Sequence, residues 1–177
     1  HEEQRLAGGV GTREQHAAIS MIKNLNLKTW PLEEAQLLDH KAKALKALES
    51  ITNARKHLEA AEQAGSEAAR AKVLALQPVE LDLALRVHSN DSVRKLLEKK
   101  VQKSGQEDKE AKIDRNGCAY DSLPFICVAA AANNAKGLEL LLVDGDVNLV
   151  DEDGNTAVHH AVQSRSWDAL RALGKVR

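Results

Sequence analysis

The sequence predicts an all-α protein, in which an N-terminal helical hairpin or small bundle precedes a stack of helical repeats, an α-solenoid. Three observations support this fold class. The 177 residues are 43% hydrophobic but only 2% aromatic, so the core must consist mainly of Leu, Ala, Val and Ile, as is usual for packed helices. Residues 32–64 place apolar side chains at helical spacing. Residues 79–177 repeat one apolar register three times.

The charge balance and the cysteines exclude several classes of function. With 25 basic and 26 acidic residues the net charge is -1, so no bulk field attracts nucleic acid or an anionic membrane. The longest apolar stretch, residues 123–132, is about half of the roughly 20 residues that cross a bilayer as a helix. Two cysteines without a C-x-x-C pair give no disulfide framework and favour a reducing compartment. We expect a cytoplasmic protein with no nucleic-acid partner and no membrane insertion.

The N-terminal part of the chain changes character near residue 12. Residues 1–11 are polar and contain glycines, which predicts a disordered tail. Residues 12–77 are expected to form the helical region. It starts with a short amphipathic helix, in which Ala18 and Ile22 share one face.

The strongest helical segment spans residues 32–64, and Gly65 after it is a typical helix stop. Its apolar positions recur every seven residues and form one stripe: Leu37, Ala44, Ile51 and Leu58. The stripe needs a partner helix, which can belong to this chain or to a second copy in a coiled-coil homodimer. Basic residues of this helix, Arg55 among them, alternate with acidic ones, which predicts a solvated face rather than a nucleic-acid surface. Ser66 is expected to cap a shorter helix, residues 68–76, which Pro78 helps to end.

The rest of the chain contains an internal repeat. Residues 81–85, 126–130 and 158–162 align without gaps, and the first, fourth and fifth places are apolar or small in all three. The fourth places are the alanines Ala84, Ala129 and Ala161. Aliphatic residues follow each alanine at nine and twelve positions: Val93, Leu138, Leu170, Leu96, Leu141 and Leu173. A small residue at one helical position lets neighbouring helix pairs approach closely, so the spacing predicts stacked two-helix units.

The last unit carries the most specific motif. Residues 151–161, DEDGNTAVHHA, closely resemble the ankyrin-repeat pattern D-x-x-G-x-T-P-L-H-x-A, with Ala157 in the proline place. The preceding unit resembles the family's turn at residues 114–117 and its ending at residues 140–148. The first unit, residues 79–100, keeps only the helical skeleton.

This resemblance implies ankyrin-like repeats over residues 78–177, each made of a β-turn finger and two antiparallel helices. It also implies a hydrogen-bonded pair between Thr156 and His159, and a concave face that holds protein partners. The spacing from Ala129 to Ala161 is close to the family period of about 33 residues, whereas the spacing from Ala84 to Ala129 is clearly longer. The extra residues predict a polar loop near residues 101–119, which is either a surface loop or an extended finger that contacts a partner.

No residue pattern predicts catalysis, a cofactor or a metal. Cys127 falls at a core position of the repeat and Cys118 near a turn, so neither is expected to be a nucleophile. The acidic cluster over residues 144–153 lacks the register of a calcium loop, and the histidines lack zinc-site spacing. Trp167 is expected in the core or at a stacking edge rather than as a binding hot spot.

The leading functional hypothesis is a non-catalytic protein–protein interaction module. It binds a protein partner, and the acidic finger favours a partner with a basic segment. The predicted contact set consists of polar residues in the finger turns and on the first helix of the last unit: Asn116, Glu152, Asp153, Asn155, His160, Gln163 and Ser164. Two alternatives remain open. The chain can be a regulatory or scaffolding fragment of a larger enzyme or channel, or a homodimerisation element that acts through the long helix.

Overall fold

A computed structural model of the chain describes residues 11–26, 34–98, 113–119 and 121–176. Within these residues the regular secondary structure consists of eight α-helices and no strand, which confirms the predicted all-α class. The chain divides into two compact units after Val87, rather than at the predicted boundary between residues 77 and 78. The predicted N-terminal tail lies outside the described residues except for Gly11, and the predicted polar loop does so up to residue 112.

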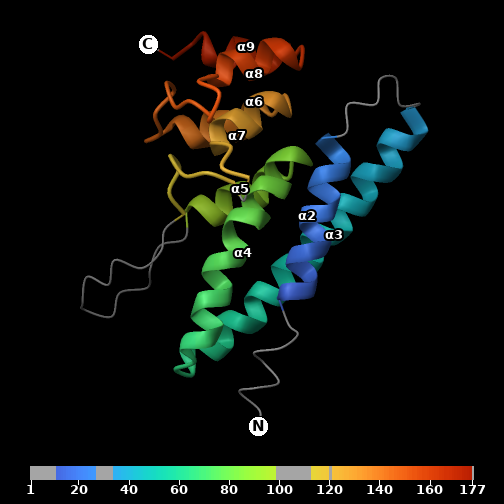
Figure 1. The fold of residues 1–177 in the computed structure, drawn as a ribbon, viewed down its shortest axis with the longest axis vertical. Helices are drawn as coiled ribbons and strands as arrows, with labels where there is room; N and C mark the ends of the chain where they lie inside the picture. Colours follow the sequence, from blue (N-terminus) through green and yellow to red (C-terminus); the bar gives the residue numbers. More distant parts are fainter. Residues whose placement is uncertain (1–10, 27–33, 99–112, 120, 177) are drawn as a thin grey trace. The chain divides into compact units, whose positions relative to one another are not determined.

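The described part of the first unit contains three helices, α2 (Thr12–Asn26), α3 (Glu34–Gln63) and α4 (Glu67–Arg86). They run alternately in opposite directions (Figure 1), and each packs against the other two. On α3 the stripe residues Ala44, Ile51 and Leu58 are at most 2% exposed. The partner helices of this stripe are therefore α2 and α4, so the described part of the stripe is not free to pair with a second copy. The side chain of Leu37, the first stripe position, lies outside the described part.

The turn between α3 and α4 follows the sequence closely. Gly65 has a φ of +96°, a left-handed conformation that glycine adopts without strain. The Oγ of Ser66 accepts a hydrogen bond from the backbone N–H of Ala69 at 3.3 Å, which satisfies one of the free donors of the first turn of α4. The predicted helix stop and the predicted cap are both confirmed.

The predicted helix end near Pro78 is wrong, because α4 continues through this proline to Arg86. A proline inside a helix removes one ladder hydrogen bond and crowds the preceding turn, at a cost of about 3 kcal/mol. Apolar side chains on both sides of it, Val73, Leu76 and Val79, are at most 5% exposed. Burial of each such side chain stabilises the fold by about 1.5–3 kcal/mol, so packing outweighs the local cost of the proline.

A buried ionic cluster joins α3 to α4. The Nε and Nη2 of Arg55 donate to the two carboxylate oxygens of Glu80 at 2.5 and 3.2 Å, and its Nη1 donates to Glu59 at 2.6 Å. Thr52 donates its hydroxyl to Glu80 at 2.7 Å. Burial lowers the pKa of Arg55, but the hydrogen bonds and charges of Glu80 and Glu59 outweigh burial and raise it. Arg55 is only 8% exposed, so the prediction of a solvated face is wrong at this residue.

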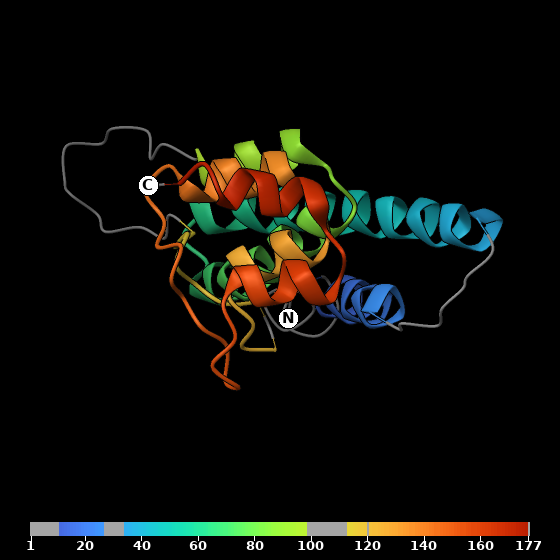
Figure 2. The same cartoon turned by 90° about the horizontal axis from the view of Figure 1, so that it is seen from above.

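The described part of the second unit contains five shorter helices in two layers: α5 (Asn90–Leu97), α6 (Phe125–Ala131), α7 (Ala135–Leu142), α8 (Ala157–Gln163) and α9 (Trp167–Leu173). α6 packs against α8, while α7 packs against α5 and α9. Within each pair, α6 packs against α7 and α8 packs against α9. Figure 2 shows α6 and α8 in one layer and α7 and α9 in the other. A finger precedes each of α6 and α8; finger 1 is residues 114–124 and finger 2 is residues 146–156.

The α6–α7 and α8–α9 segments repeat one geometry, offset along the chain by the spacing from Ala129 to Ala161, which we call the repeat spacing. An isolated antiparallel β-bridge closes each finger, Cys118 with Pro124 and Val150 with Thr156. The first residues of α6 and α8 are one repeat spacing apart, and so are those of α7 and α9. The second and third predicted units therefore have matching local structures.

The repeated alanines occupy equivalent places in these two segments. Ala129 and Ala161 are fully buried, and each carbonyl accepts a hydrogen bond from the backbone N–H five positions later, at 3.0 and 2.8 Å. Between the two helices, Asn133 and Arg165 have φ values of 54° and 53°. The alanine register thus marks a helix–turn–helix of one fixed shape.

The first predicted unit fits less well. α5 precedes α7 by the same longer spacing that separates Ala84 from Ala129, and His88 before α5 has a φ of 60°, like the turn residues of the later units. Ala84 is fully buried as well, but it lies in α4, and the division after Val87 separates α4 from α5. The residues predicted to form one repeat therefore belong to two compact units.

Candidate functional site

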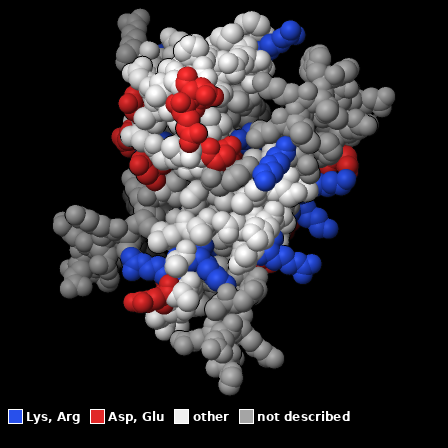
Figure 3. All heavy atoms as spheres, in the orientation of Figure 1, with Lys and Arg blue, Asp and Glu red and all other residues white. Residues whose placement is uncertain are grey.

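The strongest charge feature of the second unit lies along finger 2. Residues 144–153 contain five carboxylates and no lysine or arginine. Glu152 and Asp153 at the tip are exposed, as is Asp146 at the base. Figure 3 shows acidic side chains gathered on one face of this unit. The field there favours a cation or a hydrogen-bond donor.

Asp151 holds the conformation of finger 2. Its Oδ1 accepts hydrogen bonds from the backbone N–H groups of Asp153 at 3.0 Å and Asn155 at 2.8 Å. Its Oδ2 lies 2.7 Å from the Nε2 of His160 on α8. The hydrogen bond from Asn155, followed by the interactions with His160 and Asp153, lowers the pKa of Asp151. One ionised carboxylate therefore closes the turn and ties it to α8.

The tip of finger 2 requires a left-handed residue. Gly154 has a φ of 78° and donates its N–H to the carbonyl of Asp151 at 3.0 Å. The equivalent residue of finger 1, Ser122, has a φ of 63° and makes the equivalent bond to Ala119 at 3.1 Å. Because non-glycine residues rarely adopt this conformation, finger 2 forms its tip with less strain than finger 1.

Two polar contacts link finger 1 to the chain at the base of finger 2. Arg115 donates from Nη1 to the Oδ2 of Asp144 at 2.9 Å. The Oδ1 of Asn116 accepts a hydrogen bond from the backbone N–H of Asp146 at 2.7 Å, and the Asn116 N–H donates to Asp114 at 2.9 Å. Asn116, a member of the predicted contact set, thus uses its carbonyl oxygen on the neighbouring finger.

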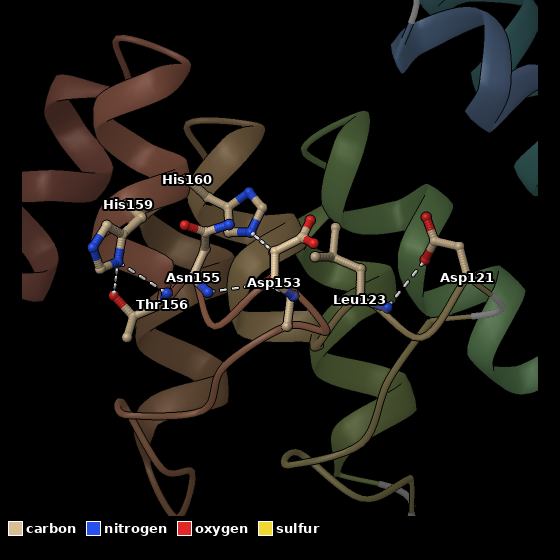
Figure 4. Close-up of polar contacts among 8 residues, drawn as sticks. Asp121, Leu123, Asp153, Asn155, Thr156, His159 and His160 are labelled. Atoms are coloured by element: carbon tan, nitrogen blue, oxygen red, sulfur yellow. Dashed lines mark hydrogen bonds and ion pairs between the residues drawn. The ribbon is translucent and has the colours of Figure 1, made fainter.

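The predicted pair at the start of α8 is confirmed. The backbone N–H of Thr156 donates to the Nδ1 of His159 at 3.1 Å, and the Thr156 hydroxyl lies 2.9 Å from the same nitrogen. Figure 4 shows the His159 ring turned back over Thr156, while His160 faces finger 2. His159 therefore has a structural role at the start of α8, and its Nδ1 is occupied by the contacts with Thr156.

The contact set is confined to the second unit and falls into three places. Glu152, Asp153 and Asn155 lie on finger 2, and His160 lies beside them through its bond to Asp151. Asn116 lies on finger 1 and is exposed. Gln163 and Ser164 are exposed at the end of α8. The exposed part of the set therefore consists of an acidic tip, one amide of finger 1 and a separate polar helix end.

Cys127 is fully buried in α6, which confirms its predicted core position. Burial is the main cause that raises the pKa of this thiol to about 12, and the charges of Asp151 and Cys118 add to the shift. The thiol therefore stays protonated near neutral pH, and a protonated thiol is a poor nucleophile. Cys118 is exposed and forms the β-bridge of finger 1 with Pro124.

Trp167 does not lie in the core, because the residue is 65% exposed, and its placement at a stacking edge stays a prediction. Trp167 is the first residue of α9. The buried face of this helix is formed by later residues, Ala169, Ala172 and Leu173, so the first position projects beyond the packed layer.

Sequence reasoning placed Asp151 in an acidic cluster and left it out of the contact set. The sequence could have indicated this role, because an Asp side chain commonly stabilises a turn by accepting a hydrogen bond from the backbone N–H two residues later. The Arg115–Asp144 pair had no comparable signal. It joins residues 29 positions apart, and only the stacking of the two repeated segments brings them together.

The described residues contain no group of three or more His, Cys, Asp and Glu side chains arranged to hold a metal ion. None of the described helices is both long enough and apolar enough to cross a membrane. No family model, curated protein or solved structure matches this chain.

Proposed function

We propose that this chain is a non-catalytic protein–protein interaction module built on ankyrin-like repeats, with a solenoid arrangement of its helix pairs. The partner binds along the two fingers and the adjoining side of α6 and α8. The proposal is supported by the two helix–turn–helix segments that recur at the repeat spacing, each with its own finger. The Thr156–His159 pair at the start of α8 gives further support.

The observation that carries this proposal is the preorganisation of finger 2. Asp151 fixes the turn through three polar contacts, while Glu152 and Asp153 stay exposed at its tip. A loop that is ordered before binding loses less conformational entropy in a complex. Finger 2 therefore presents two carboxylates in a fixed place without using them for its own fold.

The partner is a polypeptide with a basic or hydrogen-bond-donating segment. Over residues 113–176 the chain carries nine Asp and Glu against five Lys and Arg, and the excess is concentrated in residues 144–153. Contacts between exposed charges steer association and weaken with salt. Affinity for the partner should accordingly fall as ionic strength rises.

Charge reversal at the finger tip tests the proposal. The double variant Glu152→Lys/Asp153→Lys should abolish capture of the partner from a native lysate, measured by mass spectrometry and then by titration with the identified protein. Its unfolding midpoint should stay near that of the unmodified chain, because both side chains are exposed and exposed substitutions usually change stability by less than about 0.5 kcal/mol.

The matched control is Glu98→Lys/Glu139→Lys. It makes the same change in net charge at exposed positions outside the fingers, so capture should persist. Equal capture by the tip variant and this control would refute the assignment of finger 2 to the partner.

A further inference from the structure

Hydrogen bonds between side chains and backbone form one series along the bases of the two fingers, which we call the finger ladder. The Oδ1 of Asp114 accepts from the backbone N–H of Asn116 at 2.9 Å. The Oδ1 of Asn116 accepts from the backbone N–H of Asp146 at 2.7 Å. The Oδ1 of Asp146 accepts from the backbone N–H of Asn148 at 2.8 Å. The finger ladder therefore passes from finger 1 to finger 2 through Asn116.

The contact between Asn116 and Asp146 differs from the other two contacts of the finger ladder. The Asp-x-Asn triplets at residues 114–116 and 146–148 are one repeat spacing apart, and each forms a local turn of the kind that Asp side chains commonly stabilise. Asn116 and Asp146 are instead 30 positions apart. Removal of the Asn116 amide therefore unlinks the two fingers at this point but leaves both local turns in place.

The ion pair beside the finger ladder is a weaker link. Arg115 donates from Nη1 to the Oδ2 of Asp144 at 2.9 Å, but Asp144 precedes finger 2, and its side chain is 73% exposed. Water and salt screen ion pairs at exposed positions, so such pairs contribute little to stability. Of these two polar links, the Asn116 hydrogen bond is the one that acts directly on finger 2.

Finger 2 is anchored at two places other than the side chains of its tip. At the base, Asn116 holds it from finger 1. Near the tip, the Oδ2 of Asp151 lies 2.7 Å from the Nε2 of His160 on α8. Glu152 and Asp153 are exposed between these anchors and α8. A loop that is held at two places has fewer conformations to lose on binding, so both anchors determine where the tip carboxylates lie.

We propose that Asn116 is a positioning residue of the binding site. Its amide oxygen holds the base of finger 2, and it acts on binding through finger 2 rather than by contact with the partner. This inference rests on the proposed function, in which Glu152 and Asp153 receive a basic segment. It assigns to Asn116 a role different from that of the other members of the predicted contact set.

Hydrogen exchange of the whole chain without a partner, measured by NMR, tests the anchor. Asn116→Ala removes the acceptor, so the backbone amides of Asp146, Asp153 and Asn155 should exchange about threefold to tenfold faster, as expected for loss of one neutral hydrogen bond. Asn116→Asp keeps an oxygen at the acceptor position and removes only the amide NH2 group. It should restore the slower exchange.

The matched control is Asn133→Gly. The Asn133 amide also joins the two repeated segments, because its Oδ1 accepts hydrogen bonds from the backbone N–H groups of Asp168 and Ala169 at 3.1 Å each. It lies in the turn after α6 rather than in a finger, and glycine accepts its φ of 54° without strain. Asn133→Gly should leave exchange in finger 2 unchanged.

Titration with an acetylated and amidated peptide of alternating lysine and glycine tests the link to binding. The affinity of this probe, followed by the NMR shift of the Asp153 amide, should fall about threefold to tenfold with Asn116→Ala and stay unchanged with Asn133→Gly. Asn116→Asp is compared by exchange alone, because its added charge itself attracts the peptide.

Three outcomes would overturn the inference. One is exchange in finger 2 that Asn116→Ala leaves unchanged, and the second is exchange that Asn133→Gly speeds equally. The third is faster exchange with no loss of peptide affinity. Weaker peptide binding with unchanged exchange would show that Asn116 contacts the ligand directly. These outcomes leave the proposed function standing. Peptide binding that is absent, or that Glu152→Lys/Asp153→Lys does not weaken, would instead count against the proposed function, while exchange would still decide the role of Asn116.

Discussion

The two units hold their helices together by different means. In the first unit the helices have 15, 30 and 20 residues, and a buried arginine–glutamate pair joins two of them. In the second unit they have only 7 or 8 residues. Isolated helices shorter than about 12–15 residues are marginal in water. The second unit therefore depends on close packing of alanines and on short polar links at turns, and the two units should respond to different substitutions.

The largest effect is expected in the ionic cluster of the first unit. Glu80 is 1% exposed and Arg55 is 8% exposed. Glu80→Ala leaves the guanidinium buried without its bidentate partner, and loss of one member of such a pair costs about 3–5 kcal/mol. Urea denaturation should show this loss as a lower midpoint, together with faster hydrogen exchange in α3.

The control for this prediction replaces both partners. Arg55→Met/Glu80→Leu removes the charges together and fills the space with apolar atoms, which is often neutral or stabilising. The double variant should recover most of the stability that Glu80→Ala loses. If both variants lose the same amount, the cost arises from lost packing rather than from an unpaired charge.

The second unit should instead be sensitive to side-chain volume. Ala161 is fully buried, whereas its neighbour Val162 is 59% exposed. Ala161→Leu forces three extra carbons into the contact between α6 and α8 and should cost about 1–3 kcal/mol. Val162→Leu adds one carbon on the open side and should change the free energy of unfolding by less than about 0.5 kcal/mol. Comparable losses from both would show that the alanine register does not set the helix spacing.

The sequence was informative where a local rule decides the structure. Gly65 and Ser66 mark the turn between α3 and α4 through backbone conformation and capping, and the hydrogen-bonded pair of Thr156 and His159 lies within one motif. The alanine register located the buried side of α6 and α8 because close helix contacts require small residues.

The sequence was uninformative where distant residues decide. Arg55 and Glu80 are 25 positions apart, so the charge pattern of the helix alone indicated a solvated face. Pro78 stays inside α4 because its neighbours are buried, which overrides its local preference. For the candidate site, the motif located finger 2 correctly. Only the side-chain geometry shows that Asp151 holds the turn, whereas Glu152 is exposed.

The smallest expected effect on stability comes from the charge of Asp151 in finger 2, and it depends on pH. The pKa of Asp151 lies below its ordinary value of 3.8 in the folded chain, chiefly because Asn155 donates a hydrogen bond to it and because His160 and Asp153 add to this. The unfolded chain therefore binds the proton of Asp151 more readily than the folded chain does. The stability that the charge of Asp151 contributes is complete at pH values above the ordinary pKa, and it is lost as the pH falls through the lowered pKa of the folded chain.

Asp151→Asn keeps the oxygen that accepts the backbone hydrogen bonds but removes the charge. The unmodified chain should have a larger free energy of unfolding than this variant at neutral pH. Urea denaturation at a series of pH values, from neutral to strongly acidic, should show that this difference shrinks only when the pH falls below the ordinary pKa of Asp151. Asp153→Asn, at the exposed tip, should run parallel to the unmodified chain over that range. A constant difference between Asp151→Asn and the unmodified chain would mean that the charge of Asp151 does not stabilise the finger.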